Sequence, residues 1–265
     1  MKIWTVANQK GGVGKTTTAV SLGGILAQWG LRTLLIDIDP HGSLTSYFKY
    51  DPDVIEDGVY TLFKAAIDKK RLEPLSLIYP TGTSSLDLLP AKMSLAVLDR
   101  TAGKLEGMGL IIKNALSKLE SSYDYVIIDC PPFLGVLMIN ALAACEHLVI
   151  PVQTEFLAIK GLERMLHTLQ MVLRSRQIEL PYTIVPTMYD MRTRASQDSI
   201  RVLRGSYKEH LWESLIPIDT RLREASRAGI PPSLYDPNSR AVAAYTNLLE
   251  ILLHGSDKLF SDVAI

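Results

Sequence analysis

One glycine-rich run constrains this chain more than any other segment. It reads Lys10-Gly11-Gly12-Val13-Gly14-Lys15-Thr16-Thr17. A short apolar stretch of β type, residues 3–7, precedes it, and a helical pattern over residues 17–29 follows at once. Glycines let the backbone curl so that successive N–H groups converge on a polyphosphate, and the helix N-terminus adds partial positive charge. The segment therefore predicts a phosphate-binding loop between a strand and a helix.

Two side chains of this run have predicted roles in that loop. Lys15 is expected to reach the β- and γ-phosphate oxygens, and Thr16 to ligate Mg²⁺. The pattern G-x-x-x-x-G-K-[ST] would need a glycine at Gln9, so the match is to the variant form KGGxGK[ST], in which Lys10 is the additional feature. A glycine-rich turn without a ligand is the alternative interpretation.

Carboxylates end two further apolar runs. Residues 33–38 lead into Asp39, and residues 125–128 lead into Asp129. Parallel strands deliver their carboxyl ends to one edge of a sheet, so both acids are expected beside the γ-phosphate and the metal. Asp129 is predicted to hold Mg²⁺ with Thr16, while Asp39, also near the metal, orients the attacking water or accepts its proton. Either carboxylate could instead cap the next helix.

The order of apolar patterns predicts an α/β fold. Expected strands and helices alternate along the chain, with strands at 3–7, 33–38, 86–89, 125–128, 148–152 and 183–186, and helices at 17–29, 107–119 and 158–173. This alternation is typical of a single-domain, mostly parallel twisted sheet with helices on both faces. The run YDYVIID is apolar at consecutive positions, which predicts a central strand, whereas residues 79–85 are expected to be a loop.

Composition narrows the possible classes of protein. With 265 residues, of which 47% are hydrophobic, disorder and disulfide scaffolds are excluded. Lys+Arg 28 balances Asp+Glu 28, so any binding to nucleic acid must come from a local patch. Cys130 and Cys145 lie in apolar surroundings, and neither a signal peptide nor a spanning segment is expected, which favours the cytoplasm.

The motifs NQKGGVGKTT, DIDPHGSLT and YDYVIIDCPP resemble the ParA/MinD family of deviant Walker A ATPases, on the ParA side. The resemblance covers residues 1–253 and implies a P-loop NTPase fold, a single ATPase domain over residues 1–265 and a short tail at 254–265. The stretches MSLAVLDR, GMGL and QTEFLAIKGLERM look most like the ParC branch, which positions chemotaxis arrays at a cell pole.

The resemblance implies a weak Mg²⁺-dependent ATPase that works as a switch. ATP is expected between two subunits of a homodimer, with Lys10 crossing to the partner's phosphates, so that hydrolysis waits for dimerisation. By the same resemblance Pro217 and Asp219 contact adenine, and Arg192 and Arg221 contact DNA without sequence preference.

Alternatives remain for the platform, meaning the surface that the ATP dimer binds, and for the cellular role of the protein. The ATP dimer could ride on nucleoid DNA, as in chromosome or plasmid partitioning, or on a pole-organising protein that hands cargo to a coupling partner. Direct membrane binding is disfavoured, because the tail carries one lysine and no sustained apolar face. A metabolic P-loop ligase is also disfavoured, because no inserted substrate-binding segment is evident. An iron–sulfur protein is disfavoured because Cys130 is expected to face the core.

Overall fold

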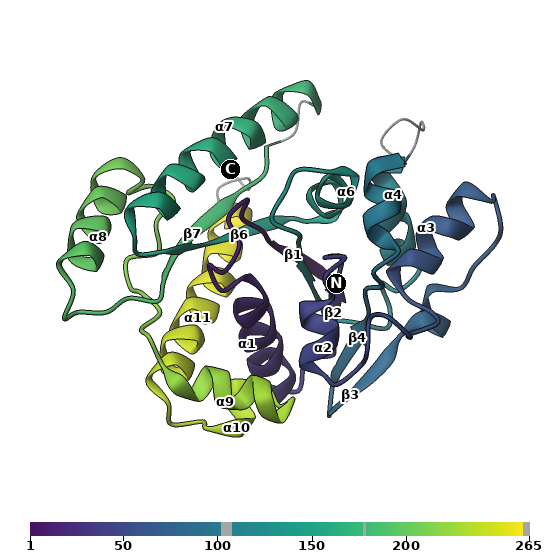
Figure 1. Ribbon diagram of the computed structural model, residues 1–265, viewed down its shortest axis with the longest axis horizontal. Helices are drawn as coiled ribbons and strands as arrows, with labels where there is room; N and C mark the ends of the chain where they lie inside the picture. The colour runs from purple at the N-terminus through teal and green to yellow at the C-terminus, as the bar shows by residue number, and fades with distance from the viewer. Residues whose placement is uncertain (102–107, 177–178, 262–265) are drawn as a thin grey trace.

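The computed structural model describes residues 1–101, 108–176 and 179–261, with the backbone alone at 172, 174–176 and 254–261. One seven-stranded sheet runs through the molecule in the order β3-β4-β2-β5-β1-β6-β7 (Figure 1). The strands are β1 (Lys2–Val6), β2 (Thr33–Asp37), β3 (Tyr79–Thr83), β4 (Leu86–Leu89), β5 (Tyr125–Asp129), β6 (His147–Gln153) and β7 (Tyr182–Thr187). Every neighbouring pair is parallel except β3 and β4, which confirms the predicted α/β class.

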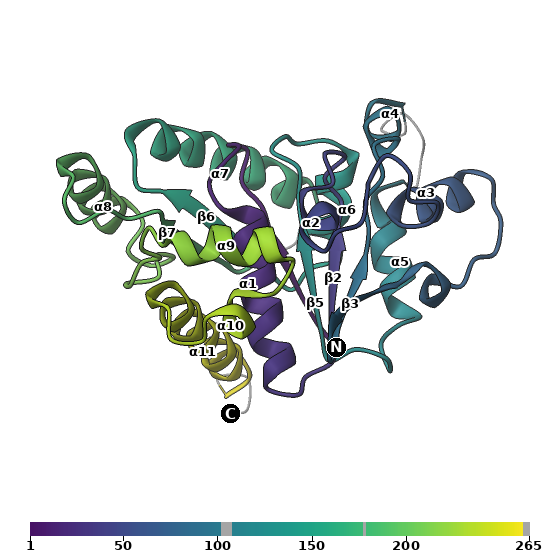
Figure 2. The same ribbon diagram turned by 60° about the horizontal axis from the view of Figure 1, so that its bottom comes forward.

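Helices cover both faces of this sheet. They are α1 (Lys15–Gln28), α2 (Ser43–Tyr47), α3 (Val59–Ile67), α4 (Leu95–Thr101), α5 (Ile111–Ser117), α6 (Val136–Ala144), α7 (Phe156–Arg176), α8 (Arg194–Ser206), α9 (Thr220–Ala228), α10 (Pro232–Tyr235) and α11 (Arg240–Ser261), with 3₁₀ turns η1 (Pro74–Leu77) and η3 (Met108–Leu110). Figure 2 shows α1, α9, α10 and α11 together on one side of the sheet. Of the helix predicted over 107–119, residue 107 lies outside the described residues, and the rest forms η3 and α5.

The position of β5 in the centre of the sheet explains why its sequence is a continuous apolar run. Val126 and Ile128 pack into the core shared with α3, α5, α6 and α7, whereas Ile127 points into the opposite core with α1 and α11. All three side chains are fully buried. A strand covered on both faces needs apolar residues at consecutive positions, so YDYVIID takes the central place predicted for it.

Residues 79–85 contradict the predicted loop. Tyr79–Thr83 forms β3, an antiparallel edge strand that pairs with β4 and shifts register between Pro80 and Thr83. Proline and glycine weaken a strand pattern and are tolerated at sheet edges, so the local sequence resembles a turn. Pairing with β4 supplies the order that the local sequence does not.

The C-terminal helix runs past the expected boundary at residue 253, since the backbone of α11 stays helical to Ser261. Side chains of the predicted tail, 254–265, lie outside the described residues, and the proposed single domain of 1–265 stays a prediction. Among the helices described, none combines the length and the apolar character needed to cross a bilayer.

His147 at the start of β6 should make the fold sensitive to acid. The ring is partly buried, with Nε2 2.9 Å from Thr183 Oγ1, and burial lowers the pKa of the imidazole to about 4. The unfolded chain, with a histidine pKa of ~6.5, binds the proton more readily, so stability is full above pH ~6.5 and falls as the pH drops towards 4. Between pH 8 and pH 5 we expect His147→Gln to lose about 2 kcal/mol less unfolding free energy than the wild type. Urea denaturation at both pH values measures this, and equal losses would contradict it.

Candidate nucleotide-binding site

The phosphate-binding loop lies between β1 and α1, as predicted. Buried Asn8 anchors its start: Asn8 Nδ2 donates to Pro151 O at 2.8 Å, and Asn8 Oδ1 accepts from Lys10 N at 3.0 Å. Gly12 and Gly14 have φ of 75° and 90°, a left-handed conformation that favours glycine. Thr18 N donates to Gly14 O at 2.9 Å and starts α1. No acidic residue lies in the first turn of α1, so the positive end of the helix dipole is uncompensated there.

The remaining loop residues pack against the end of β7. Thr187 Oγ1 donates to Val13 O at 2.8 Å, and the position of a Cβ on Gly14 would be 3.9 Å from Met188 Cε. Lys15 is 8% exposed, and its Nζ donates to Lys10 O at 3.2 Å. The ammonium group is therefore folded over the loop on which phosphates would sit.

Thr16 and Asp129 meet where a magnesium ion was predicted. Thr16 Oγ1 donates to Asp129 Oδ2 at 2.6 Å. Asp129 is 1% exposed, its Oδ1 has no hydrogen-bond partner, and burial raises the pKa of its carboxyl well above the usual value. An orphaned carboxylate oxygen next to a hydroxyl matches the hard oxygen ligands that Mg²⁺ takes. Among the described residues, no group of three or more His, Cys, Asp or Glu side chains is placed to hold a metal ion.

The carboxylates of the β2 end lie beside Asp129. Asp37 is paired in register with Asp129 on adjacent strands, and burial raises the pKa of Asp37 to about 7. Asp37 Oδ1 accepts from Asp39 N at 3.1 Å, while Oδ2 accepts from Thr45 N at 2.8 Å. Asp39 Oδ1 in turn accepts from His41 N at 3.0 Å, with His41 Nδ1 at 2.9 Å. Asp37 thus holds the turn that presents Asp39.

The second lysine of the loop points elsewhere. Lys10 Nζ pairs with Glu155, which immediately precedes α7, instead of lying over its own loop. Neither side chain is buried, at 27% and 40% exposed. Lys10 therefore stands at the surface beside the phosphate-binding loop, with its ammonium held by an acid from another element.

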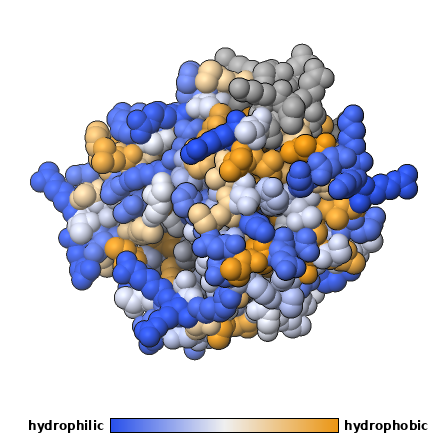
Figure 3. All heavy atoms as spheres, turned by 45° about the vertical axis from the view of Figure 1, so that its right-hand side comes forward, coloured by the Kyte–Doolittle hydropathy of each residue, from blue (hydrophilic) through white to orange (hydrophobic). Residues whose placement is uncertain are grey.

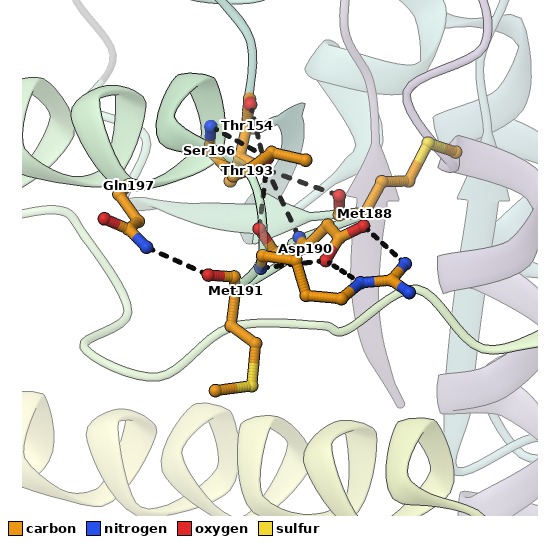
Figure 4. Close-up of polar contacts among 8 residues, drawn as sticks. Thr154, Met188, Asp190, Met191, Thr193, Ser196 and Gln197 are labelled. Atoms are coloured by element: carbon orange, nitrogen blue, oxygen red, sulfur yellow. Dashed lines mark hydrogen bonds and ion pairs between the residues drawn. The ribbon is translucent and has the colours of Figure 1, made fainter.

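Arg192 lies in the turn between β7 and α8. Its Nε donates to Asp190 Oδ1 at 2.9 Å and its Nη2 to Asp190 Oδ2 at 2.8 Å (Figure 4). This fork lowers the pKa of Asp190 to about 2. Ser196 Oγ accepts from Thr154 Oγ1 at 3.1 Å and ties the turn to the end of β6. The arginine is exposed, but an acid two residues away offsets its charge.

The residues predicted to contact adenine and DNA lie around the start of α9. Pro217 forms a bridge with Tyr189 after β7. Asp219 caps α9, accepting from Arg221 N at 3.0 Å, and its other oxygen accepts from Ala241 N at 3.2 Å. Arg221 Nη1 donates to Glu224 Oε2 at 2.7 Å, and its Nε lies 3.2 Å from an oxygen of Asp236. Both oxygens of Asp219 therefore have structural partners.

Several residues that organise the site escaped the sequence analysis. Asn8 lies two residues before the glycine-rich run and Asp37 lies inside the quoted DIDP segment, so position alone was a signal for both. Glu155 lies in the quoted QTEFLAIKGLERM stretch, but no sequence pattern pairs it with Lys10, 145 residues away, or pairs Thr187 with Val13, 174 residues away. Cys130 is fully buried, as expected for a packed thiol.

Known proteins resemble the chain over nearly its whole length. A family model described as an AAA domain matches residues 1–181. The sporulation initiation inhibitor protein Soj of Bacillus subtilis is 39% identical over 248 residues, which cover 93% of this chain and 96% of that protein. The chromosome partitioning protein ParA of Myxococcus xanthus is 36% identical over 248 residues, covering 93% and 86%.

Solved structures share the fold. A cobyrinic acid a,c-diamide synthase from Mycobacterium smegmatis, with bound ADP and magnesium, has a TM-score of 0.80 and 33% identity over 97% of this chain and 96% of that one. A putative plasmid partition protein from Borrelia burgdorferi, bound to AMPPNP, has a TM-score of 0.79 and 27% identity over 96% and 99%. The matched family model and the curated relatives together show that the chain belongs to the ParA/Soj family.

Proposed function

We propose that this protein is an ATP-dependent dimerisation switch with weak Mg²⁺-dependent ATPase activity, which segregates or positions a cellular cargo. The observation that supports this proposal is that the two lysines of the phosphate-binding loop point in different directions. Lys15 is buried over the loop, whereas Lys10 is turned away to Glu155 at the surface. A cation placed there can serve a partner's phosphates, so hydrolysis would wait for dimerisation.

Each residue of the site then has a chemical task. Main-chain N–H groups of Gly11 to Thr17 and the Lys15 ammonium bind the phosphates. Thr16 and Asp129 would hold Mg²⁺, which when bound neutralises charge on the β- and γ-phosphates. Asp39, oriented by Asp37 and His41, accepts the proton of the attacking water. Pro217 and Asp219 are proposed to line the adenine side.

Replacing Asp39 should trap the ATP-bound dimer. Asp39→Ala removes the proton acceptor but neither the phosphate-binding loop nor Thr16 and Asp129. We expect turnover to fall at least about 100-fold, within the range of general-base contributions, with nucleotide affinity changed less than about threefold. Phosphate release and sedimentation with ATP measure the two effects. Wild-type turnover in this variant would remove Asp39 from catalysis.

The relatives favour a partitioning role on DNA, because Soj and ParA are named for chromosome partitioning. We propose that Arg192 and Arg221 hold the dimer on DNA once their acids, Asp190 and Glu224, are displaced by phosphates. The test is retention of the trapped Asp39→Ala dimer on non-specific duplex DNA at low and physiological salt, since phosphate contacts weaken steeply with salt.

Charge reversal sharpens this test. The double variant Arg192→Glu with Arg221→Glu should retain at least about tenfold less DNA than the wild type, because each lost phosphate contact weakens binding to a similar extent for every DNA sequence. Its ATPase rate should stay that of the wild type. Lys64→Glu on α3 is the matched control. Salt-insensitive or ATP-independent retention would contradict the DNA role.

Polar positioning of chemotaxis arrays is the second candidate, favoured by the MSLAVLDR and QTEFLAIKGLERM stretches. In this role the ATP dimer would bind a pole-organising protein, and a coupling partner would connect it to the cargo. The protein would then be concentrated in the cytoplasm near a cell pole. Failure of the trapped dimer to bind DNA or anionic liposomes would favour it. A metabolic ligase is distinguished by rate, since only a dimerisation switch has a turnover per subunit that rises with protein concentration in the absence of a second substrate.

A further inference from the structure

Helix α6 borrows its N-terminal cap from a distant helix. The residue at its own N-cap position, Gly135, has no side chain to accept a hydrogen bond. Instead Asp99 Oδ1 of α4 accepts from Leu137 N at 2.9 Å, across 38 positions of sequence. A carboxylate at this place satisfies an orphan N–H group and complements the helix dipole. Asp99 is therefore bonded to the first turn of α6.

The carboxylate of Asp99 lies very close to Gly135. A Cβ placed on Gly135 would lie 2.0 Å from Asp99 Oδ2 and 2.4 Å from Oδ1, too close for any real side chain. The backbone of Gly135 is extended, with φ −121°, so its conformation does not itself require glycine. Glycine leaves room there for the carboxylate of Asp99, which any Cβ at this position would displace.

Between β5 and α6 runs a segment of residues 130–135, here called the post-β5 loop. Its Phe133, 40% exposed, borders two pockets at once. One, of about 750 Å³, also includes Pro40, His41 and Asp99, and the other, of about 520 Å³, also includes Lys10. The loop thus lies between the Asp39 turn and Lys10.

The two ends of the post-β5 loop are held differently. At its start Cys130 N donates to Val6 O at 3.2 Å, so the sheet holds Asp129 in place independently of the conformation of the rest of the loop. At its end the loop enters α6 beneath Asp99. Helix α4 buries only Leu95 and Leu98 among its seven residues. Figure 3 brings forward the side of the molecule that carries α3 and α4, where hydrophobic and hydrophilic side chains are interspersed.

We propose that Asp99 is a positioning residue for the post-β5 loop, and that by fixing Phe133 beside Lys10 it sets the ATP-dependent dimerisation of this protein. The inference rests on the proposed dimerisation switch. Nucleotide binding itself is unaffected, because the phosphate-binding loop and Asp129 are held by β1, α1 and β5 and do not contact Asp99. The residue acts after nucleotide binding and before the dimer closes.

The first test separates binding from dimerisation. Asp99→Ala should bind a fluorescent ATP analogue with Mg²⁺ within about twofold of wild type, yet need about tenfold more protein for ATP-dependent dimerisation, the scale of one lost helix cap. Asp99→Asn keeps an acceptor oxygen and should restore dimerisation to within about threefold. Asp53→Ala is the matched control, since Asp53 lines the same pocket and its carboxylate has no polar partner among the described residues. Parallel loss of nucleotide affinity and thermal stability in Asp99→Ala would mean a merely structural role and overturn the proposal.

The second test uses the close contact. Gly135→Ala should weaken dimerisation at least as much as Asp99→Ala, because the new methyl group displaces the carboxylate. In the Asp99→Ala background the same glycine substitution should add almost nothing, since the space is then free. A full additional loss there would overturn the proposal. If the wild type itself fails to dimerise with ATP, the proposed function fails instead; if the wild type dimerises and Asp99→Ala matches it, only the role of Asp99 falls.

Discussion

Lys15→Ala should abolish measurable nucleotide binding. The ammonium of this lysine is folded over the phosphate-binding loop, 3.2 Å from Lys10 O, and the side chain is 8% exposed. Charge-assisted hydrogen bonds to phosphate oxygens in such a place are worth about 3 kcal/mol, so affinity should fall by at least about 100-fold. Titration with a fluorescent ATP analogue in Mg²⁺ measures the loss.

Two controls guard this result. Lys64→Ala removes a lysine of α3 that, within the described part of the chain, pairs with Asp68 on the same helix, and it should bind nucleotide as the wild type does. The thermal unfolding of Lys15→Ala without nucleotide should stay close to that of the wild type, because within the described residues Lys15 Nζ makes one hydrogen bond, to Lys10 O. Retained affinity in Lys15→Ala would place the phosphates elsewhere.

Lys10→Ala should separate nucleotide binding from dimerisation. Lys10 is paired with Glu155 and does not lie over its own loop, so the affinity of the monomer for ATP should change less than about threefold. If the ammonium serves the partner's phosphates, its loss should raise the protein concentration for ATP-dependent dimerisation by at least about 100-fold. Sedimentation velocity with ATP and with ADP measures both states.

Glu155→Gln is the matched variant for this prediction. It frees Lys10 from its acid without removing the ammonium, so dimerisation with ATP should be equal to or stronger than that of the wild type. Equal dimerisation in Lys10→Ala and the wild type would exclude the role of this lysine across the subunit boundary. Weaker dimerisation in Glu155→Gln would mean that the ion pair supports the dimer instead of competing with it.

The amino-acid sequence by itself determined the local parts of the site and the class of fold. The glycine-rich run needs left-handed backbone at Gly12 and Gly14, and the unbroken apolar run before Asp129 needs cover on both faces of a sheet. Each of these requirements can be recognised within a few residues of sequence. The placement of Thr16 beside Asp129 follows, because parallel strands end at one edge.

Local pattern was a weaker guide for the surface. Arg192 was singled out by resemblance, but the sequence did not indicate that Asp190 would bind it as a fork. The edge strand Tyr79–Thr83 was missed because its residues are typical of a turn. In both places the structure depends on a contact partner that no periodic pattern in the sequence predicts.

Only the tertiary structure decided which distant groups hold the site together. Glu155 reaches Lys10, Thr187 reaches Val13 and Asp99 caps α6 through contacts that join separate elements of the sheet and its helices. A single carboxylate or hydroxyl carries no periodicity, so nothing in its own neighbourhood predicts its partner. Chain folding brings these groups together, because buried donors and acceptors must be satisfied wherever the packing of apolar faces leaves them.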